Sequence, residues 1–249
     1  MKIIKIDYLT WYFFLVLFLC GYIKIGLIIL GIVLWHELGH VLVSKVFHFK
    51  ILEVRIYPFG GITKLEKDIN TPLHQEFFLG CAGIAMQIIL GIAIFLMPLD
   101  MNLKEIIVKY NTSILLFNML PIVPLDGAFI VNSFLNYIFS YKLAYRLMIV
   151  ISVLGVLTYG VSNYFFNLNN YLLLGLFIYK IYEYIKNYKY VINRFLLERY
   201  LKKISFRNIS TKKGDLDILK IGTYQYFKEG KKIVSEQTKL AQRFDKEGL

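Results

Sequence analysis

The pentapeptide His36-Glu37-Leu38-Gly39-His40 contains the residue types of a metal-dependent hydrolase. Two histidines four residues apart lie on one face of an α-helix, one turn from each other, which is the spacing that two ligands of a tetrahedral zinc ion require. A glutamate beside the first histidine is suited to act as a general base. We therefore expect one zinc ion per chain, bound by His36 and His40. Glu37 is expected to take a proton from water and deliver it to the leaving amine.

The sequence around this cluster is almost entirely apolar. Between Ile25 and Val46 the charged residues are Glu37 and Lys45. An ionisable cluster at membrane depth is costly and indicates a functional site. The alternative is a helix whose histidines only form hydrogen bonds with their neighbours, and this alternative does not explain why the groups occur together in apolar sequence.

The composition is that of a membrane protein. Of the 249 residues, 57% are hydrophobic, and the mean hydropathy is +0.55. Soluble domains are nearer half apolar, and here the apolar residues form blocks long enough to cross a bilayer. We predict an all-α polytopic membrane protein. Its six transmembrane helices are expected over residues 8–23, 25–46, 77–97, 106–138, 143–162 and 168–184.

Residues 48–71 differ in character from the apolar blocks. Two β-prone, partly alternating stretches, 51–57 and 62–66, flank the sequence Pro58-Phe59-Gly60-Gly61, which predicts a turn. The pattern predicts a short β-hairpin at the membrane surface, and a plain amphipathic connector is the alternative. The edge of such a hairpin is suited to hold an extended substrate by strand addition. Gly60 and Gly61 are therefore assigned to substrate binding.

The predicted fourth span cannot be one regular helix. Residues 118–127, Asn-Met-Leu-Pro-Ile-Val-Pro-Leu-Asp-Gly, place two prolines in apolar sequence, and each proline removes a backbone donor. Irregular backbone at membrane depth occurs where it is buried in protein or lines a wet cavity. Asp126 is the only other acid well inside a predicted span. We therefore expect it to be the third zinc ligand.

Three further polar or turn-forming positions are assigned from their place in these spans. Asn118 lies about two helical turns before Asp126 and is expected to bind the tetrahedral oxyanion or orient the substrate. Pro124 is assigned to substrate binding. Gln87, in the third span, either faces the site or forms an interhelical hydrogen bond. The small residues of that span, among them Gly83, predict close packing against the helix that carries the histidines.

The distribution of positive charge predicts the orientation of the chain in the cell membrane. With a cytoplasmic N-terminus, 26 Lys and Arg residues lie in predicted inside segments and 3 in outside segments. This is the asymmetry of a protein with both termini in the cytoplasm. In that layout His40 and Asp126 both lie about 25 Å from the outer surface, at about 1.5 Å per helical residue.

The C-terminal region carries most of the net charge. The formal net charge is +12, and the sequence from Lys180 onward contributes nine of these charges. Beside membrane spans, a basic tail is expected to face anionic lipid rather than nucleic acid. We predict a membrane domain over residues 1–185 and a small basic cytoplasmic tail over 186–249. Within the tail, residues 194–203 are interpreted as an interfacial amphipathic helix.

The histidine motif together with segment 118–127 resembles the site-2 protease family of intramembrane zinc metalloproteases, over about residues 5–200. The resemblance implies that His36, His40 and Asp126 bind zinc and that Glu37 is the catalytic base. The Pro-Phe-Gly-Gly turn, the six spans and the Phe-Leu-Leu-Glu-Arg-Tyr stretch are most similar to the sporulation stage IV branch. That branch implies a membrane-associated sigma-factor precursor as substrate and inhibitory membrane proteins as partners.

Two features depart from this family. The family often has Ala-Gly-Pro where this chain has Ala82-Gly83-Ile84, and its relatives carry a nucleotide-sensing CBS domain after the spans. Residues 186–249 are too short for a tandem CBS pair and would be a truncated remnant, so ATP control by that route is not expected.

Two other functional interpretations are considered. One is a membrane metalloprotein without protease activity, such as a scaffold or transporter. The other is a di-iron membrane oxidase, which needs several histidine-rich boxes that four histidines cannot fill.

Overall fold

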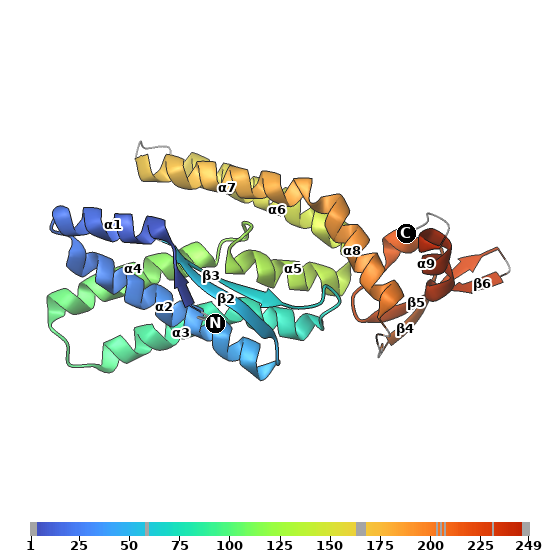
Figure 1. Ribbon diagram of the computed structural model, residues 1–249, viewed down its shortest axis with the longest axis horizontal. Coiled ribbons are helices and arrows are strands. Elements are labelled where there is room, and N and C mark those ends of the chain that lie inside the picture. The colour runs from blue at the N-terminus through green and yellow to red at the C-terminus, as the bar shows by residue number, and fades with distance from the viewer. Residues whose placement is uncertain are drawn as a thin grey trace. The chain divides into compact units, whose positions relative to one another are not determined.

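The computed structural model describes residues 4–57, 60–162, 168–202, 204, 206, 208–230 and 232–245. This part of the chain is mainly helical (Figure 1). The α-helices are α1 (Tyr8–Leu19), α2 (Ile23–Val46), α3 (Leu73–Leu96), α4 (Met101–Asn118), α5 (Asp126–Ile138), α6 (Tyr141–Ser162), α7 (Leu168–Lys186), α8 (Tyr188–Leu201) and α9 (Glu236–Phe244). The strands and the 3-10 helix are β1 (Ile4–Ile6), β2 (Lys50–Tyr57), β3 (Gly60–Glu66), β4 (Asn208–Lys212), η1 (Leu216–Ile218), β5 (Thr223–Glu229) and β6 (Lys232–Ser235).

The chain divides into two compact units. The first contains Met1–Lys67, Phe78–Leu120 and Leu125–Gly127, and the second contains Asp68–Phe77, Pro121–Pro124 and Ala128–Leu249.

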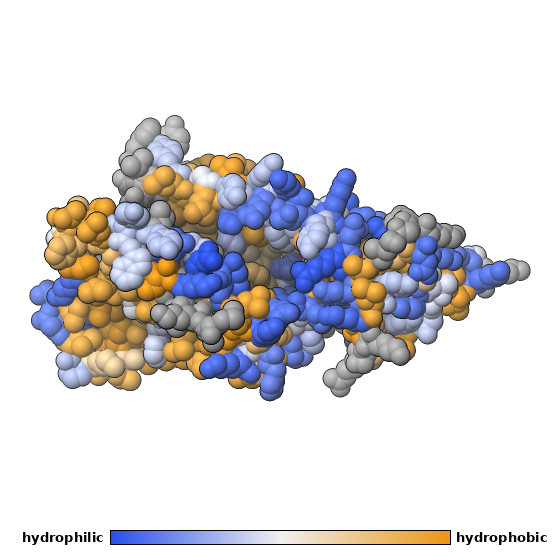
Figure 2. All heavy atoms as spheres, viewed as in Figure 1, coloured by the Kyte–Doolittle hydropathy of each residue, from blue (hydrophilic) through white to orange (hydrophobic). Residues whose placement is uncertain are grey.

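Three helices in the described part of the chain are long and apolar enough to cross a membrane: Ile23–Val46, Leu73–Leu96 and Tyr141–Val161. Large apolar side chains on the first unit remain exposed, including Leu19, Leu27, Phe95 and Leu116. Figure 2 shows apolar residues over much of the surface formed by α1 to α4. An apolar surface of this extent suits contact with lipid rather than water.

The predicted fourth span is two helices in the structure. α4 ends at Asn118, and α5 begins at Asp126. Each proline of the intervening loop lacks a backbone N–H, so a continuous helix would lose hydrogen bonds there. The break therefore lies in the proline-containing segment indicated by the sequence.

A three-stranded sheet belongs to the first unit. β1 pairs with β2 in parallel, and β2 pairs with β3 in antiparallel fashion, with Val54 opposite Thr63. β2 is therefore the central strand, and the outer edge of β3 is an edge of the sheet.

The strands expected over 51–57 and 62–66 lie within β2 and β3. Two residues of the expected turn, Pro58 and Phe59, lie outside the described residues. The placement of this sheet at a membrane surface stays a prediction.

Glu53 on β2 lies among three cations. The distances from its carboxylate oxygens are 2.9 Å to Lys64 Nζ, 3.1 Å to Lys5 Nζ and 3.0 Å to Arg55 Nη2. The hydrogen bonds from Lys64 and then Lys5 lower the pKa of Glu53 to about 2. Because these lysines come from β3 and β1, the ion pairs link all three strands.

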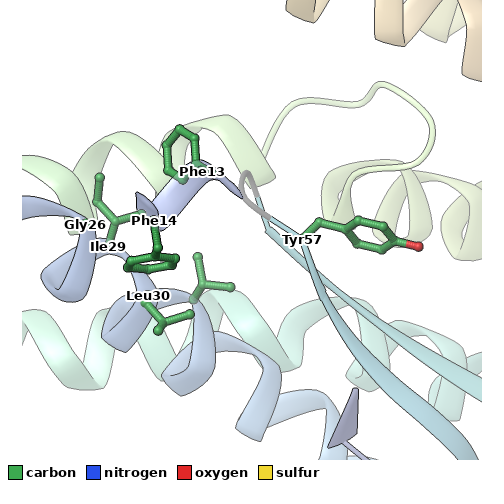
Figure 3. A pocket seen from close by; sticks show the side chains of 7 residues that line it. Phe13, Phe14, Gly26, Ile29, Leu30 and Tyr57 are labelled. Carbon is green, nitrogen blue, oxygen red and sulfur yellow. The ribbon is translucent and has the colours of Figure 1, made fainter. Parts of the chain in front are cut away.

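A small apolar hollow lies among α1, α2 and β2 (Figure 3), and it is lined by Phe13, Phe14, Gly26, Ile29, Leu30, Val33 and Tyr57. Its volume of about 10 Å³ corresponds to about one water molecule. A Cβ on Gly26 would lie 2.5 Å from Leu17 Cδ1, so the glycine allows α1 and α2 to approach closely. The hollow is a packing gap and is too small to bind a substrate.

In the second unit, residues of the tail form an apolar core together with Tyr141, the first residue of α6. β5 pairs with β4 in parallel and with β6 in antiparallel fashion. The buried core residues are Tyr141, Phe195, Leu196, Leu216, Leu219, Ile221, Phe227 and Leu240. The interpretation of residues 194–203 as an interfacial helix implies that its apolar side chains face lipid, and this is wrong for two of them. Phe195 and Leu196, on α8, pack into this core and are 2% exposed.

α8 also binds the segment that follows β3. Glu198 Oε2 accepts hydrogen bonds from the backbone N–H of Ile69 at 2.8 Å and of Asn70 at 3.4 Å. The side-chain amide of Asn70 donates to Phe195 O at 3.4 Å. The tail therefore holds the connector between β3 and α3.

A buried ion pair crosses the core of the tail. Arg199 Nε lies 2.6 Å from Glu236 Oε1, and the two side chains are 0% and 2% exposed. The guanidinium also donates to Lys220 O and Thr223 O, while Glu236 accepts from the backbone N–H of Gln225. Burial lowers the pKa of Arg199 and raises the pKa of Glu236, and the attraction between the two groups opposes both shifts.

We predict that Arg199→Met lowers the free energy of unfolding by about 3–5 kcal/mol, because the Glu236 carboxylate is left buried without its partner. Thermal and proteolytic unfolding of the full chain in detergent would measure this. The double variant Arg199→Met, Glu236→Leu should recover most of the loss, since no unpaired charge remains. Arg194→Met is the matched control, because Arg194 lies on the same helix and is 48% exposed. Equal effects of Arg199→Met and Arg194→Met would contradict the prediction.

Candidate active site

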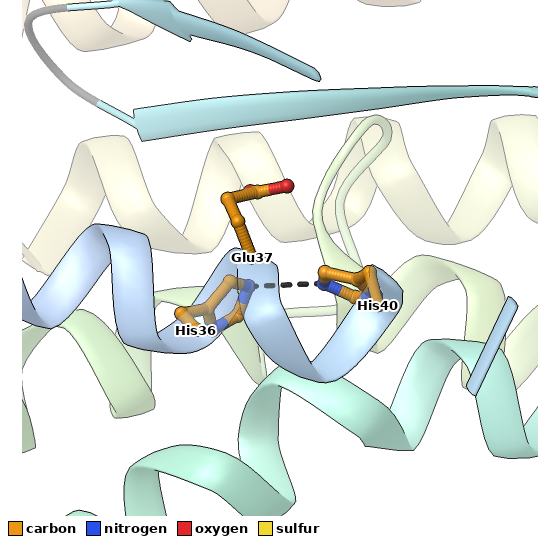
Figure 4. A group of neighbouring side chains, drawn as sticks. All are labelled: His36, Glu37 and His40. Atoms are coloured by element: carbon orange, nitrogen blue, oxygen red, sulfur yellow. Dashed lines mark hydrogen bonds between the residues drawn. The ribbon is translucent and has the colours of Figure 1, made fainter. Parts of the chain in front are cut away.

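α2 carries His36, Glu37 and His40 within about one turn of one apolar helix (Figure 4). His36 and Glu37 are both 6% exposed, and His40 is half-buried. In Figure 4 the two imidazoles lie next to each other, and the Glu37 side chain extends from α2 toward the strands. One ligand atom from each of the three side chains lies within 4.8 Å of the other two, which is close enough for the group to hold a metal ion.

Asp126, the first residue of α5, meets both imidazoles. Its Oδ2 atom lies 3.1 Å from His36 Nε2 and 3.3 Å from His40 Nε2. The two Nε2 atoms are 3.2 Å apart. The three atoms thus form a nearly equilateral triangle, and the structure brings together the three residues that the sequence predicted as ligands.

The other ring nitrogens of the histidines fix which atom carries the proton. His36 Nδ1 lies 3.2 Å from Gln87 Oε1, and His40 Nδ1 lies 3.1 Å from the backbone carbonyl of Leu79. Because carbonyl oxygens only accept hydrogen bonds, each Nδ1 is the donor. In the neutral imidazoles each Nε2 then has a free lone pair, and both lone pairs face Asp126.

This triangle fits a zinc ion. The buried Oδ2 atom of Asp126 has no hydrogen-bond partner within the described part of the chain. It therefore faces two electron-pair donors, and a cation would satisfy all three atoms. Ligand atoms at about 2.0–2.1 Å in tetrahedral geometry lie about 3.3 Å apart, which is close to the observed 3.1, 3.2 and 3.3 Å. Zinc-binding histidines also typically donate their second N–H to a carbonyl or carboxylate.

Three glycines allow the close approaches that this arrangement requires. A Cβ on Gly83 of α3 would lie 2.2 Å from His36 Cε1 and 2.4 Å from His36 Nε2. A Cβ on Gly39 of α2 would lie 2.5 Å from Ala82 O, and one on Gly127 would lie 2.3 Å from Met119 O. Gly83 therefore leaves the space that His36 occupies, and Gly127 allows the chain to return close to the end of α4 at Asp126.

α3 is held against the histidine-bearing helix by polar contacts as well. Trp35 Nε1 donates to Met86 O at 2.7 Å. Gln87 is fully buried, and its backbone carbonyl accepts from Asn111 Nδ2 of α4 at 3.0 Å. Gln87 therefore faces the site through its side chain and links two helices through its backbone, so both of the alternatives drawn from the sequence apply.

Glu37 makes its contacts with β3. Its Oε2 atom accepts a hydrogen bond from Thr63 Oγ1 at 2.6 Å. A Cβ on Gly61 would lie 2.4–2.6 Å from Cγ, Cδ and Oε1 of the same side chain. The sequence did not single out Thr63, because a threonine in an alternating strand is common whether or not it faces a functional group.

The remaining predicted residues have different surroundings. Asn118 Nδ2 donates to Ile114 O, one turn earlier in α4, at 3.1 Å. Gly60 begins β3 opposite Tyr57, and Pro124 lies in the loop before Asp126. Their roles in binding the oxyanion or the substrate stay predictions.

Two histidines, a buried aspartate and a neighbouring glutamate on apolar helices are the features of a membrane metalloprotease. A family model described as peptidase family M50 matches residues 24–102. Stage IV sporulation protein FB of Bacillus subtilis is 33% identical over 192 residues, which cover 74% of this chain and 67% of that protein. The chain belongs to peptidase family M50, the site-2 protease family, and it is a metalloprotease. The resemblance stated from the sequence is confirmed.

Two further similarities concern Methanocaldococcus jannaschii. A zinc metalloprotease of this organism is 31% identical over 116 residues, which cover 44% of this chain and 33% of that protein. The solved structure of a site-2 protease from the same organism matches with a TM-score of 0.52 at 21% identity, covering 82% of this chain and 95% of that chain. The structural match shows a common fold, and the family implies zinc as the metal.

We predict that Gly83→Ala weakens zinc binding by on the order of 10- to 100-fold, because the new methyl group displaces the His36 ring. Zinc content after dialysis against a graded chelator would measure the change, and thermal unfolding would show whether the fold is retained. Gly91→Ala on the same helix is the control, since its Cβ would meet Asn111 Nδ2 at 3.6 Å, an ordinary contact. Unchanged affinity in Gly83→Ala would contradict the position of His36 as a ligand.

Proposed function

We propose that this metalloprotease hydrolyses a peptide bond, in or near the membrane, of a membrane-associated protein. In this proposal His36, His40 and Asp126 bind one zinc ion per chain, and Glu37 is the general base. The observation that supports it best is the triangle of His36 Nε2, His40 Nε2 and Asp126 Oδ2, with separations of 3.1, 3.2 and 3.3 Å.

When bound, zinc supplies a Lewis acid that polarises the scissile carbonyl and makes water more acidic. Glu37 contributes the proton transfers. Because Oε2 accepts from Thr63, Oε1 is the oxygen that takes the proton from the attacking water. The water oxygen bonds to the carbonyl carbon, the C–N bond breaks, and Glu37 returns the proton to the leaving nitrogen.

The substrate is proposed to bind as an extended strand at β3. β2 is already paired on both sides, by β1 and β3, so the edges of this sheet are the outer edges of β1 and β3. Of these two strands, β3 is the one whose Thr63 donates to Glu37. Gly60, Gly61 and Pro124 are proposed to contact the substrate, with main-chain hydrogen bonds supplying the affinity. Asn118 is proposed to bind the oxyanion, which requires its side chain to turn away from Ile114 O.

The arrangement in the cell membrane is proposed to be six spans with both termini in the cytoplasm. Support comes from the distribution of 26 and 3 basic residues between the two sides. This layout places the site in the cytoplasmic half of the bilayer, and the basic tail over 186–249 beside anionic lipid.

The substrate class is proposed to be a sigma-factor precursor cleaved during sporulation, with inhibitory membrane proteins as partners. The similarity to stage IV sporulation protein FB, which covers 74% of the chain, supports this assignment. Co-expression with candidate sigma-factor precursors, followed by immunoblotting for the shortened product, is the direct test. Cleavage only of unrelated membrane proteins would contradict the sporulation assignment while leaving the protease assignment intact.

We predict that Glu37→Gln lowers kcat by on the order of 10²- to 10⁴-fold, because the amide cannot accept the proton from water. Zinc content should stay at that of the unmodified chain, since Glu37 is not among the three ligands. The measurement is cleavage of a co-expressed membrane-tethered substrate, together with elemental analysis. Glu105→Gln, at an exposed position of α4, is the control. Undiminished cleavage by Glu37→Gln would rule out the general-base role.

For Asp126→Ala we predict the loss of both zinc and activity, because two imidazoles alone leave the triangle incomplete. Elemental analysis of the purified full chain checks the metal directly. Asp215→Ala, an exposed acid in the tail with a side-chain exposure of 77%, should retain zinc. Full zinc occupancy in Asp126→Ala would show that the aspartate is not a ligand.

A further inference from the structure

β3 presents two residues to the Glu37 carboxylate from one face of the strand. Gly61 and Thr63 are two positions apart, so they lie on the same side of β3. Thr63 Oγ1 donates to Glu37 Oε2 at 2.6 Å, and the Gly61 backbone lies close enough that a Cβ would be 2.6 Å from Glu37 Oε1. β3 therefore contacts both oxygens of the carboxylate, Oε2 through a hydrogen bond and Oε1 through the close approach of Gly61.

The contact from Thr63 has the length of a hydrogen bond to an ionised carboxylate. Such O–H···O⁻ bonds are about 2.5–2.7 Å long and stronger than bonds between neutral groups. Glu37 is 6% exposed, so water does not readily replace a lost donor. The hydroxyl fixes one oxygen and leaves the other for proton transfer.

Thr63 is itself held in place by the sheet. It lies opposite Val54 of β2, which is 5% exposed, and β2 is paired on both of its edges. A hydroxyl on a paired strand is a more rigid donor than one on a loop, and rigid support determines how accurately a catalytic group is placed.

We infer that Thr63 is a positioning residue for the general base and that Gly61 provides the space in which the Glu37 carboxylate is held. The inference rests on the proposed function, in which Glu37 takes the proton from water. It assigns β3 a second task, because the strand whose outer edge is proposed to pair with the substrate also orients the base.

A purely structural role would have different consequences. If the hydroxyl only satisfied a buried carboxylate, its removal would lower stability without changing turnover per folded molecule. A positioning role changes kcat while KM and zinc content stay the same, because the oriented base acts in the transition state. The conservative change Thr63→Ser retains the hydroxyl, so it helps to distinguish the positioning role from the structural role.

The test compares Thr63→Val, Thr63→Ser and Thr211→Val in the full chain, purified in detergent and loaded with zinc. Thr211 lies at an exposed position of β4, so its variant makes the same chemical change in another strand. We expect kcat to fall about 10- to 100-fold in Thr63→Val, with KM and zinc content unchanged, because misplacement of a catalytic group by about 1 Å costs up to that much. Thr63→Ser should recover most of the activity, and Thr211→Val should match the unmodified chain.

Gly61→Ala provides a second variant that does not remove the hydrogen-bond donor. The atoms that its Cβ would meet belong to the Glu37 side chain and not to backbone. We therefore expect the carboxylate to shift while the fold is kept, with a loss of kcat at unchanged melting temperature. A Gly61→Ala variant with full kcat would overturn the role assigned to Gly61.

Stability measurements test the contact without any substrate. If Thr63 and Glu37 interact, the change in melting temperature caused by Thr63→Val should be smaller in a Glu37→Ala background than in the unmodified chain. Full kcat in Thr63→Val, alongside an inactive Glu37→Gln, would overturn the inference and leave the proposed function standing. Cleavage that is equally fast in Glu37→Gln would overturn the proposed function and the inference together.

Discussion

Three electron-pair donors lie close together inside apolar protein. Much of the first unit serves to hold these three side chains in place. His36 Nε2, His40 Nε2 and Asp126 Oδ2 lie within 3.3 Å of one another. Acceptors that face each other without a donor are unfavourable in a buried setting. The hydrogen bonds at the two Nδ1 atoms prevent the imidazoles from turning their N–H groups inward. The fold thus keeps an arrangement that a bound cation would relieve, and this supports the proposed zinc site.

The proposed base, Glu37, is held by different elements from the three proposed zinc ligands. α2 carries both, but the imidazoles are supported by α3 and by the start of α5, whereas Glu37 is supported by β3. His36 and Glu37 are neighbours in the sequence, so the two environments begin one residue apart on α2. In the proposed function, this division allows a rigid metal site to coexist with a base that is aligned from the strand side.

Sequence patterns singled out the proposed ligands because their spacing is local or their chemistry is rare. His36 and His40 are one turn apart, and Asp126 stands out as an acid in apolar sequence. The supporting residues were harder to assign. Gly83 resembled any small residue at a helix contact, and Thr63 resembled any polar residue in a strand. Their functions depend on partners 47 and 26 positions away, and spacing rules for single helices or strands do not report such contacts.

The tail is a second case in which the sequence pattern does not show which partner a residue contacts. The apolar residues of α8 indicate that something covers them, but sequence alone does not distinguish lipid from protein. In the structure Phe195 and Leu196 are covered by protein, because they pack with tail residues and with Tyr141 of α6, whose ring stacks on Phe195 at 4.2 Å. Because Glu198 of the same helix binds the backbone of Ile69, the folded tail holds the chain three residues beyond the end of β3. The strand that supports Glu37 is itself anchored along its length by its pairing with β2.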